Sequence, residues 1–330
     1  MRALVTGGGG FLGSGIVRGL LNDGCDVSVI GRKAYAHLPR SVKILKGDIR
    51  DIGFVNKSLE NMDVLFHAAA IPGIWGPAEE FYGINVQGTE NIIKACRNNQ
   101  VRKLVFTSSP SVVFGQSSLE GVDESTPYPE EYLCEYSRTK ALAEKIILKA
   151  NDSNLSTVAI RPHLIWGPGD PHLVPRILEK AEKNRLVKVG EGKNLVDIIY
   201  IDNAVSAHLK ACEALTPDGN VAGKTYFVSD GEPVNLWDWI NQLLKRAGKP
   251  MVSRKISYEN AMRLGALMER TYGFLRIKNE PPMTRFLASQ LATSHYFNIS
   301  RAKNDFGYQP LVSPGEGMDR LIHSLDPSKY

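Results

Sequence analysis

The feature that most constrains this chain is a glycine-rich segment between a short apolar run and a helical pattern. Four glycines at 7–10 follow the strand-like run Ala3–Thr6, and a fifth comes at position 13. Glycine lets the backbone approach a pyrophosphate, whose charge is held by free N–H groups at the helix N-terminus. In this context the pattern predicts a dinucleotide-binding turn; a flexible turn without a ligand is the alternative. The expected contacts are Gly7, Gly10, Phe11, Leu12 and Gly13.

The first half of the chain alternates short β-branched runs with longer helical patterns. This alternation is typical of a parallel sheet with helices on both faces. We therefore expect an α/β fold, with a doubly wound, Rossmann-type parallel sheet, in a dinucleotide-binding domain over residues 1–165. The expected strands are Ala3–Thr6, Val27–Ile30, Val42–Leu45, Val64–His67, Lys103–Thr107 and Ser156–Ile160, and the expected helices are Leu12–Asn22, Ile52–Glu60, Glu79–Asn98 and Tyr136–Ala150.

The alternation weakens after about residue 165. We expect residues 166–330 to form a smaller, mostly helical lobe that binds the substrate, with isolated strands at Leu186–Val189 and Thr225–Val228. Residues 196–215 resemble a further βα unit, which we expect to return to the main sheet. The segment Ala261–Leu275 is helical and apolar on one face, which favours a core-facing helix over a lid or a membrane-surface helix.

Composition limits the class of protein and its partners. The 330 residues suffice for a large core, and their net charge of +5 is spread without a basic block, so no nucleic-acid partner is expected. The four cysteines lie far apart, which predicts no metal site and favours a reducing compartment. No stretch of about 18 apolar residues occurs, so we expect a cytoplasmic protein without a membrane span. A homodimer and partner enzymes of a lipid pathway are both compatible with the sequence.

Basic residues at the end of the second expected strand indicate which cofactor is preferred. Arg32 and Lys33 stand where an NAD-preferring site would place an acidic residue. Their positive charge favours the 2′-phosphate of NADP(H), although both could instead be solvated loop cations. Asp48, followed by Ile49, is placed to accept a hydrogen bond from the adenine amine. Small side chains follow the fourth strand where the cofactor must pass, at Ala68, Ala69 and Ala70.

A tyrosine and a lysine four residues apart indicate acid–base chemistry. Tyr136 and Lys140 share one face of an expected helix. A cation beside a phenol favours the phenolate, so Lys140 and an oxidised nicotinamide together should bring the pKa of Tyr136 towards neutrality. The fifth strand ends in a serine cluster at the sheet edge where such folds bind ligands. We predict Tyr136, Lys140 and Ser109 as catalytic, with Ser108 and Ser111 as alternatives for the substrate contact.

Several segments occur in one order over nearly the whole chain. They are the glycine-rich turn, His67–Ala70, Asn85–Asn91, the serine cluster, Tyr136 with Lys140, Arg161–Pro162 and Gly167–Asp170. Together they resemble the extended short-chain dehydrogenase/reductases, and in particular their 3β-hydroxysteroid dehydrogenase-like subgroup. The resemblance implies an NAD(P)-dependent oxidoreductase acting on CH–OH and C=O groups. It also implies that Pro162 and Ile165 border the nicotinamide and that the helix of Asn85 packs beneath the active site.

Within this family, residues 73–76, 107–112, 161–170, 200–203 and 282–288 are similar to a group of bacterial 2-alkyl-3-oxoalkanoate reductases of long-chain olefin biosynthesis. The similarity implies that NADPH reduces the 3-keto group of a 2-alkyl-3-oxoalkanoic acid to a 2-alkyl-3-hydroxyalkanoic acid, with Tyr136 as proton donor.

This small-molecule apolar substrate requires an apolar pocket and a cation for its carboxylate. We expect Trp75, Trp166 and the 261–275 helix to supply the apolar surface, and Arg285 or His163 the cation. Two alternatives remain open. One is an NAD(P)-dependent 3β-hydroxysteroid or sterol dehydrogenase. The other is a non-catalytic NADP(H)-binding redox sensor, which the presence of Tyr136 and Lys140 disfavours.

Overall fold

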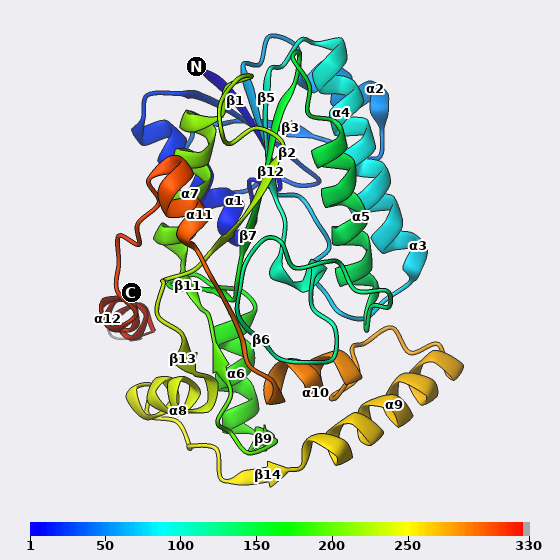
Figure 1. The fold of residues 1–330 in the computed structure, drawn as a ribbon, viewed down its shortest axis with the longest axis vertical. Helices are drawn as coiled ribbons and strands as arrows, with labels where there is room; N and C mark the ends of the chain where they lie inside the picture. The colour runs from blue at the N-terminus through cyan, green and yellow to red at the C-terminus, as the bar shows by residue number, and fades with distance from the viewer. Residues whose placement is uncertain (326–330) are drawn as a thin grey trace.

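The computed structural model describes residues 1–325, and its centre is a seven-stranded parallel sheet (Figure 1). The strand order is β12-β7-β5-β4-β1-β2-β3. The central strands are buried on both faces, which explains why they read as continuous apolar runs in the sequence. The strands are β1 (Arg2–Thr6), β2 (Asp26–Gly31), β3 (Lys43–Lys46), β4 (Val64–His67), β5 (Lys103–Thr107), β7 (Ser156–Pro162) and β12 (Lys224–Val228).

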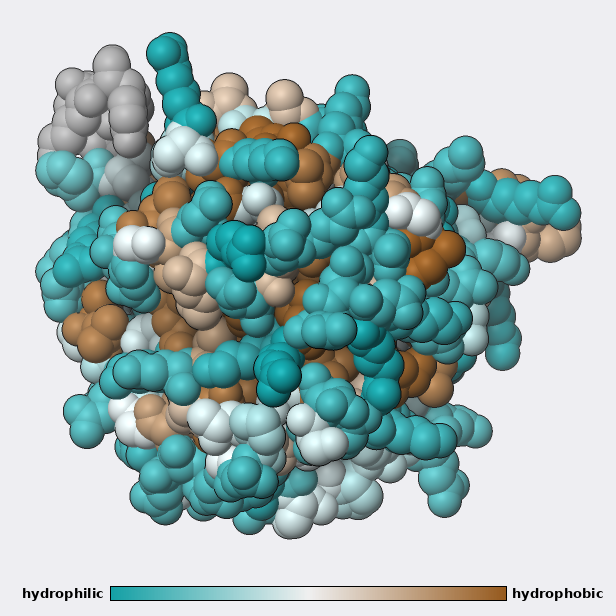
Figure 2. Space-filling view, turned by 90° about the horizontal axis from the view of Figure 1, so that it is seen from above, coloured by the Kyte–Doolittle hydropathy of each residue, from teal (hydrophilic) through white to brown (hydrophobic). Residues whose placement is uncertain are grey.

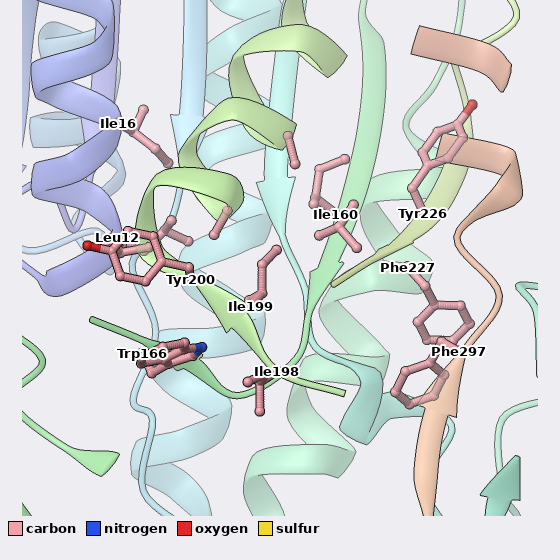
Figure 3. Packing of buried hydrophobic residues seen from close by; sticks show 14 of the residues in the cluster. Leu12, Ile16, Ile160, Trp166, Ile198, Ile199, Tyr200, Tyr226, Phe227 and Phe297 are labelled. Atoms are coloured by element: carbon pink, nitrogen blue, oxygen red, sulfur yellow. The ribbon is translucent and has the colours of Figure 1, made fainter. Parts of the chain in front are cut away.

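Helices cover both faces of this sheet and enclose two apolar clusters. On one face α1 (Phe11–Asn22) packs against α7 (Ile201–Ala214). Figure 3 shows Leu12 and Ile16 of α1 in the cluster on this face. On the other face lie α2 (Ile52–Ser58), α4 (Gly88–Asn98) and α5 (Glu135–Lys149). The predicted doubly wound, Rossmann-type α/β fold is therefore confirmed.

A smaller lobe lies beyond the carboxyl ends of the strands, at the bottom of Figure 1. It contains a four-stranded sheet of order β13-β10-β15-β6 and the two-stranded pairs β11-β8 and β14-β9. Its elements are β6 (Leu119–Val122), β8 (Ile165–Trp166), α6 (Leu173–Glu182), β9 (Val187–Val189), β10 (Leu195–Val196), β11 (Ile199–Tyr200), β13 (Val234–Asn235), α8 (Leu236–Arg246), β14 (Arg254–Ile256), α9 (Tyr258–Phe274), α10 (Arg285–Ala292), β15 (His295–Phe297) and α12 (Pro314–Ser324), which packs on α8. The helix α11 (Ser300–Phe306) returns to the main sheet, where it packs on β12 and α7.

Two segments differ from what the sequence predicted. Thr225–Val228 was expected as an isolated strand, but it belongs to β12, which pairs with β7 as an edge strand of the main sheet. Residues 196–215 return to the main sheet only through α7, because β10 and β11 pair elsewhere. Both differences arise from pairing between segments far apart in the sequence, which local periodicity does not encode.

The expected helix Glu79–Asn98 is interrupted. It consists of α3 (Ala78–Phe81), a π-helical turn (Tyr82–Gln87) and α4. Such turns insert one residue into the helical repeat and often occur at functional sites. Here the turn brings the side chain of Asn85 into the interior.

The helix α9 is less buried than a core-facing helix would be. Only Ala261 and Gly265 are buried, whereas Leu267, Phe274 and Leu275 are 63%, 87% and 59% exposed. One side of α9 packs on α10, and its far end projects from the lobe (Figure 1). The core-facing prediction is therefore wrong for this outer end.

The surface opposite the small lobe is mostly hydrophilic, with hydrophobic residues in separate patches (Figure 2). Within residues 1–325, no helix combines the length and the apolar character needed to cross a membrane.

Candidate active site

One cleft of about 820 Å³ contains the carboxyl ends of β1, β2, β4, β5 and β7. This is the edge at which open α/β sheets bind ligands. The structure brings every residue expected to contact the cofactor to the lining of this cleft. These residues are Gly7, Gly10, Phe11, Leu12, Gly13, Arg32, Lys33, Asp48, Ile49, Ala68, Ala69, Ala70, Tyr136, Lys140, Pro162 and Ile165.

The glycine-rich turn has the geometry of a phosphate cradle. Gly7 has φ +69°, and a Cβ there would lie 2.8 Å from backbone atoms of Ala69. A Cβ at Gly13 would collide with the carbonyl oxygen of Gly7. The helix α1 begins at Phe11 without a side-chain cap, so its first N–H groups are open to an anion. The turn therefore fits the pyrophosphate of a dinucleotide.

The opposite end of the cleft carries charged groups suited to an adenosine. The carboxylate of Asp48 accepts two hydrogen bonds from the Arg50 side chain, at 2.7 and 3.1 Å, and this interaction lowers the pKa of Asp48. Arg32 and Lys33 are exposed at the rim. Tyr35 also lines this end, although sequence reasoning missed it. Its ring occupies the space that a side chain at position 9 or 31 would need. The glycines at these two positions were therefore the sequence signal that could have placed Tyr35 in the site.

The predicted catalytic residues meet where β5 and α5 approach each other. Tyr136 and Lys140 lie in the first turns of α5, and Ser109 follows β5. The Lys140 ammonium donates a hydrogen bond of 2.5 Å to the carbonyl oxygen of Thr107, which joins the helix to the strand. The Ser109 hydroxyl oxygen accepts from Ser111 N at 3.2 Å. All of these side chains line the cleft.

Burial governs the protonation of the two central groups. It raises the pKa of Tyr136, and the Ser109 hydroxyl opposes this rise. It lowers the pKa of Lys140 to about 7, and the carboxylate of Glu144 opposes this fall. The expected lowering of the Tyr136 pKa is therefore not found in the protein alone, because desolvation of the phenolate exceeds every favourable contact. Of Ser108, Ser109 and Ser111, only Ser109 has a hydroxyl that affects the pKa of Tyr136.

Two buried interactions hold α5 in place, and of these the ion pair was not predicted as part of the site. Glu144 and Arg161 form a bidentate ion pair with hydrogen bonds of 2.6 and 2.9 Å, and both side chains are at most 2% exposed. Asn85 accepts from Ile71 N and donates to Thr139 Oγ1, both at 3.0 Å. Asn85 thus joins the segment after β4 to α5, beneath the active site as the family resemblance implied.

Three of the residues expected to line the substrate pocket, Trp166, Trp75 and Arg285, lie outside the cleft, and these predictions are corrected. Trp166 is fully buried and packs edge-on against Tyr200 and Trp239 (Figure 3 shows Trp166 beside Tyr200). Trp75 donates its indole N–H to the carbonyl oxygen of Ile277 and does not line the cleft.

Of the two residues expected as carboxylate partners, His163 lines the cleft, whereas Arg285 is half exposed and paired with Glu269 at 2.7 Å, outside the cleft lining. In each of the three cases tertiary packing gives the side chain a partner outside the cleft.

Comparison with known proteins identifies the family. Residues 4–257 match the profile of the 3-beta hydroxysteroid dehydrogenase/isomerase family. The 2-alkyl-3-oxoalkanoate reductase of Stenotrophomonas maltophilia (strain K279a) is 47% identical over 97% of this chain and 98% of that protein. The sterol-4-alpha-carboxylate 3-dehydrogenase, decarboxylating, of Mus musculus is 34% identical over 98% and 91%.

Solved structures share the fold. The UDP-glucuronic acid 4-epimerase from Bacillus cereus, in complex with NAD, superimposes with a TM-score of 0.76 at 22% identity, covering 98% of both chains. The resemblance predicted from the motifs is thus confirmed. The chain is an oxidoreductase, and it belongs to the 3-beta hydroxysteroid dehydrogenase/isomerase family.

Proposed function

We propose that this protein uses NADPH to reduce the 3-keto group of a 2-alkyl-3-oxoalkanoic acid, giving a 2-alkyl-3-hydroxyalkanoic acid. The observation that carries the proposal is that Tyr136, Lys140 and Ser109 line the same cleft as the glycine-rich turn. Two relatives at 47% and 44% identity, both named 2-alkyl-3-oxoalkanoate reductase, support the substrate class. Location in the cytoplasm and assembly as a homodimer stay predictions.

The three catalytic residues divide the proton chemistry. NADPH supplies a hydride when bound. Tyr136 donates its phenol proton to the keto oxygen, and the Ser109 hydroxyl hydrogen-bonds the same oxygen. The raised pKa of Tyr136 keeps this proton in place until the acceptor arrives. Lys140, held by Thr107, returns a proton from solvent to the phenolate.

The cofactor would be held mainly by residues 1–165 and the substrate mainly by residues 166–330. The pyrophosphate would lie on the turn at 7–13, the 2′-phosphate near Arg32 and Lys33, and the adenine near Asp48. After the corrections above, the apolar side chains that line the substrate end of the cleft are Ile74, Phe114, Leu173, Phe286 and Phe297. They replace the tryptophans expected from the sequence.

The test is a turnover assay with two classes of substrate. With 2-alkyl-3-oxoalkanoic acids, NADPH oxidation should occur, and kcat/KM should rise about fourfold per added methylene until the pocket is full, because each buried methylene contributes about 0.8 kcal/mol. A protein that instead oxidises a 3β-hydroxysterol with NADP⁺ and leaves the ketoacids unchanged would be a sterol dehydrogenase. Cofactor binding without turnover of either class would indicate a redox sensor.

The sterol reading has support of its own from the 34% identical relatives. The names of both groups describe an acid whose carboxylate lies on the carbon next to the one that bears the reacting oxygen. A site for that carboxylate is therefore expected whichever of the two substrates is correct.

A further inference from the structure

Two buried histidines form a pair at the substrate end of the cleft. His163 follows β7, and His295 begins β15 of the small lobe. His163 Nε2 lies 2.6 Å from His295 Nδ1, with the rings nearly perpendicular, at 87°. Both side chains line the cleft. Leu164, the next residue, has φ +46°, a conformation that side-chain-bearing residues rarely adopt, so the turn that presents His163 is strained.

The hydrogen bonds of the pair determine where its protons lie. His295 Nε2 is 2.9 Å from the carbonyl oxygen of Gln290, which can only accept, so Nε2 carries a proton. Burial lowers the pKa of both histidines, that of His295 to about 4, so both are neutral near pH 7. His295 Nδ1 is then a lone pair that accepts from His163 Nε2–H.

The remaining ring nitrogen of the pair is His163 Nδ1. In a neutral His163 whose Nε2 carries the proton, Nδ1 is also a lone pair. Within residues 1–325 no hydrogen bond to this atom is found. The pair therefore presents an unsatisfied acceptor in a cleft whose proposed ligand carries a carboxylate.

We propose that the His163–His295 pair is the subsite for the substrate carboxylate, and that it takes up one proton together with that carboxylate. The proposal rests on the proposed function. A carboxylate cannot donate to a lone pair, but one proton between the carboxylate and Nδ1 satisfies both groups. Neither histidine needs to rearrange, because His163 Nε2–H continues to donate to His295.

Other charged groups near the cleft leave this role open. Of the lysines and arginines in the described residues, Arg32, Lys33 and Lys140 line the cleft. The first two lie at the adenosine end, and the third has a catalytic role. Arg285 is paired with Glu269 outside the cleft. Carboxylate side chains near the cleft cannot bind the substrate carboxylate either, because like charges repel.

The groups packed around the pair are mainly aromatic. The rings of Phe114 and Phe297 contact the histidines edge-on. Asp170, from the loop after β8, shares the cleft, but its carboxylate accepts from the backbone N–H groups of residues 172–174. Asp197, before β11, accepts from Phe297 N beside the pair. The titratable side chains of His172, Tyr136 and Lys140 also line the cleft.

The kinetic test compares an acid with its methyl ester in the oxidation direction, in which the 2-alkyl-3-hydroxy acid is chemically stable. His163→Gln should raise KM for the acid about 10- to 100-fold, because a charge-assisted hydrogen bond is lost, and change KM for the ester less than about threefold. The matched control is His323→Gln, on α12 and outside the cleft, which should leave both values unchanged. Equal effects on acid and ester, or an effect mainly on KM for NADP⁺, would overturn the proposal.

The pH dependence separates His163 from a purely structural residue. Above the pKa of the occupied pair, KM for the acid should rise about tenfold per pH unit, whereas KM for the ester should stay constant. His295 is a positioning residue in this scheme. His295→Asn, whose amide oxygen can still accept from His163 Nε2–H, should keep much of the acid preference that His295→Leu loses.

Calorimetry provides a measurement that does not depend on turnover. Binding of the 2-alkyl-3-hydroxy acid to the NADPH complex at pH 8, in two buffers of different ionisation enthalpy, should show uptake of nearly one proton. The ester, and His163→Gln with the acid, should show none. Acid binding without proton uptake in the unmodified protein contradicts the inference. Proton uptake without turnover of any 3-hydroxy or 3-oxo acid would keep the subsite and remove the proposed function instead.

Discussion

His67, at the end of β4, lies between two threonines whose hydrogen bonds determine its protonation. Thr89 donates its hydroxyl proton to the carbonyl oxygen of Asn85, so it accepts from His67 Nε2–H at 3.0 Å. His67 Nδ1 then accepts from Thr6 Oγ1 at 2.7 Å, and Thr6 Oγ1 accepts from Ala69 N. This neutral histidine thereby holds the segment 68–70 against the glycine-rich turn. One buried imidazole thus shapes the path of the cofactor without contacting the reaction.

The cofactor preference can be tested at one residue. Arg32→Asp should lower kcat/KM for NADPH about 10- to 150-fold, because a charge-assisted hydrogen bond to the 2′-phosphate is worth about 1.5 to 3 kcal/mol, and should affect NADH much less. Arg40→Asp makes the same change at an exposed position outside the cleft and serves as control. Equal kcat/KM for NADPH and NADH in the unmodified protein contradicts the assignment.

The proton donor can be tested in the same way. Tyr136→Phe removes the phenol proton and should lower kcat by about 10² to 10⁴, while the dissociation constant for NADPH, measured by fluorescence titration, should stay within about threefold. Lys140→Ala should impair both quantities, because Lys140 is expected to orient the cofactor ribose as well as to assist Tyr136. A Tyr136→Phe enzyme with near-normal kcat, under conditions where hydride transfer limits the rate, is the contrary outcome.

Among the elements, α5 contributes two of the three proposed catalytic residues. Its first turns hold Tyr136 and Lys140, and its next turn holds Glu144, which is paired with Arg161 of β7. The hydroxyl of Tyr128 donates to the same carboxylate at 2.7 Å. This buried ion pair joins the catalytic helix to the sheet, so the position of Tyr136 depends on a contact two turns away.

The ion pair should matter for stability as well as for position. Glu144→Gln leaves the Arg161 guanidinium buried without its counter-ion and should lower the free energy of unfolding by about 3 to 5 kcal/mol. Glu316→Gln, in the surface pair with Arg320 on α12, should cost less than about 1 kcal/mol. Urea denaturation followed by circular dichroism compares the two. Similar losses in both variants would show that the buried pair has no special role.

Sequence reasoning was most successful where the signal is local. The six expected strands and the glycine-rich turn were found because each is defined by neighbouring residues. The residues expected to contact the cofactor line one cleft because parallel strands end at one edge of the sheet. The positions of Trp166 and Arg285 could not be predicted in this way. Trp166 packs on Tyr200, which is 34 residues away in the sequence. Arg285 pairs with Glu269 because α9 packs on α10. The π-helical turn at Asn85 has no simple sequence pattern.

At the scale of the whole molecule, buried neutral histidines join the main sheet to the elements around it. His67, His163, His208 and His295 are all buried, and burial lowers the pKa of each below its ordinary value, to about 3 for His67 and about 4 for His208 and His295. They connect the ends of β4, β5 and β7 to neighbouring helices and to the small lobe. The architecture around the cleft is therefore sensitive to acid.

The sign of this effect follows from proton binding. Between pH 6.5 and 4.5 the four buried histidines become protonated in the unfolded chain but stay largely neutral in the folded chain, so the free energy of unfolding falls as the pH falls. Asp197 and Asp230, whose pKa values burial raises to about 6, act in the opposite direction. The balance of about two protons predicts a loss of about 3 kcal/mol per pH unit near pH 5.

Urea denaturation at pH 6.5, 5.5 and 4.5 measures this loss. The variant His208→Gln should lose stability less steeply as the pH falls, by about 1.4 kcal/mol per pH unit, because one buried histidine no longer contributes. A free energy of unfolding that stays constant or increases as the pH is lowered from 6.5 to 4.5 contradicts the assignment of the buried histidines as neutral.

The central claim is that the cleft transfers hydride to the 3-keto carbon of a 2-alkyl-3-oxoalkanoic acid. The most direct measurement uses NADPH deuterated on either face of C4 of the nicotinamide and analyses the product by mass spectrometry and NMR. The account predicts a 2-alkyl-3-hydroxyalkanoic acid with one deuterium on C3 from one of the two labelled cofactors, and loss of this product in Tyr136→Phe. A protein that yields no deuterated hydroxy acid from either cofactor, yet moves hydride from C3 of a 3β-hydroxysterol to NADP⁺, would contradict it.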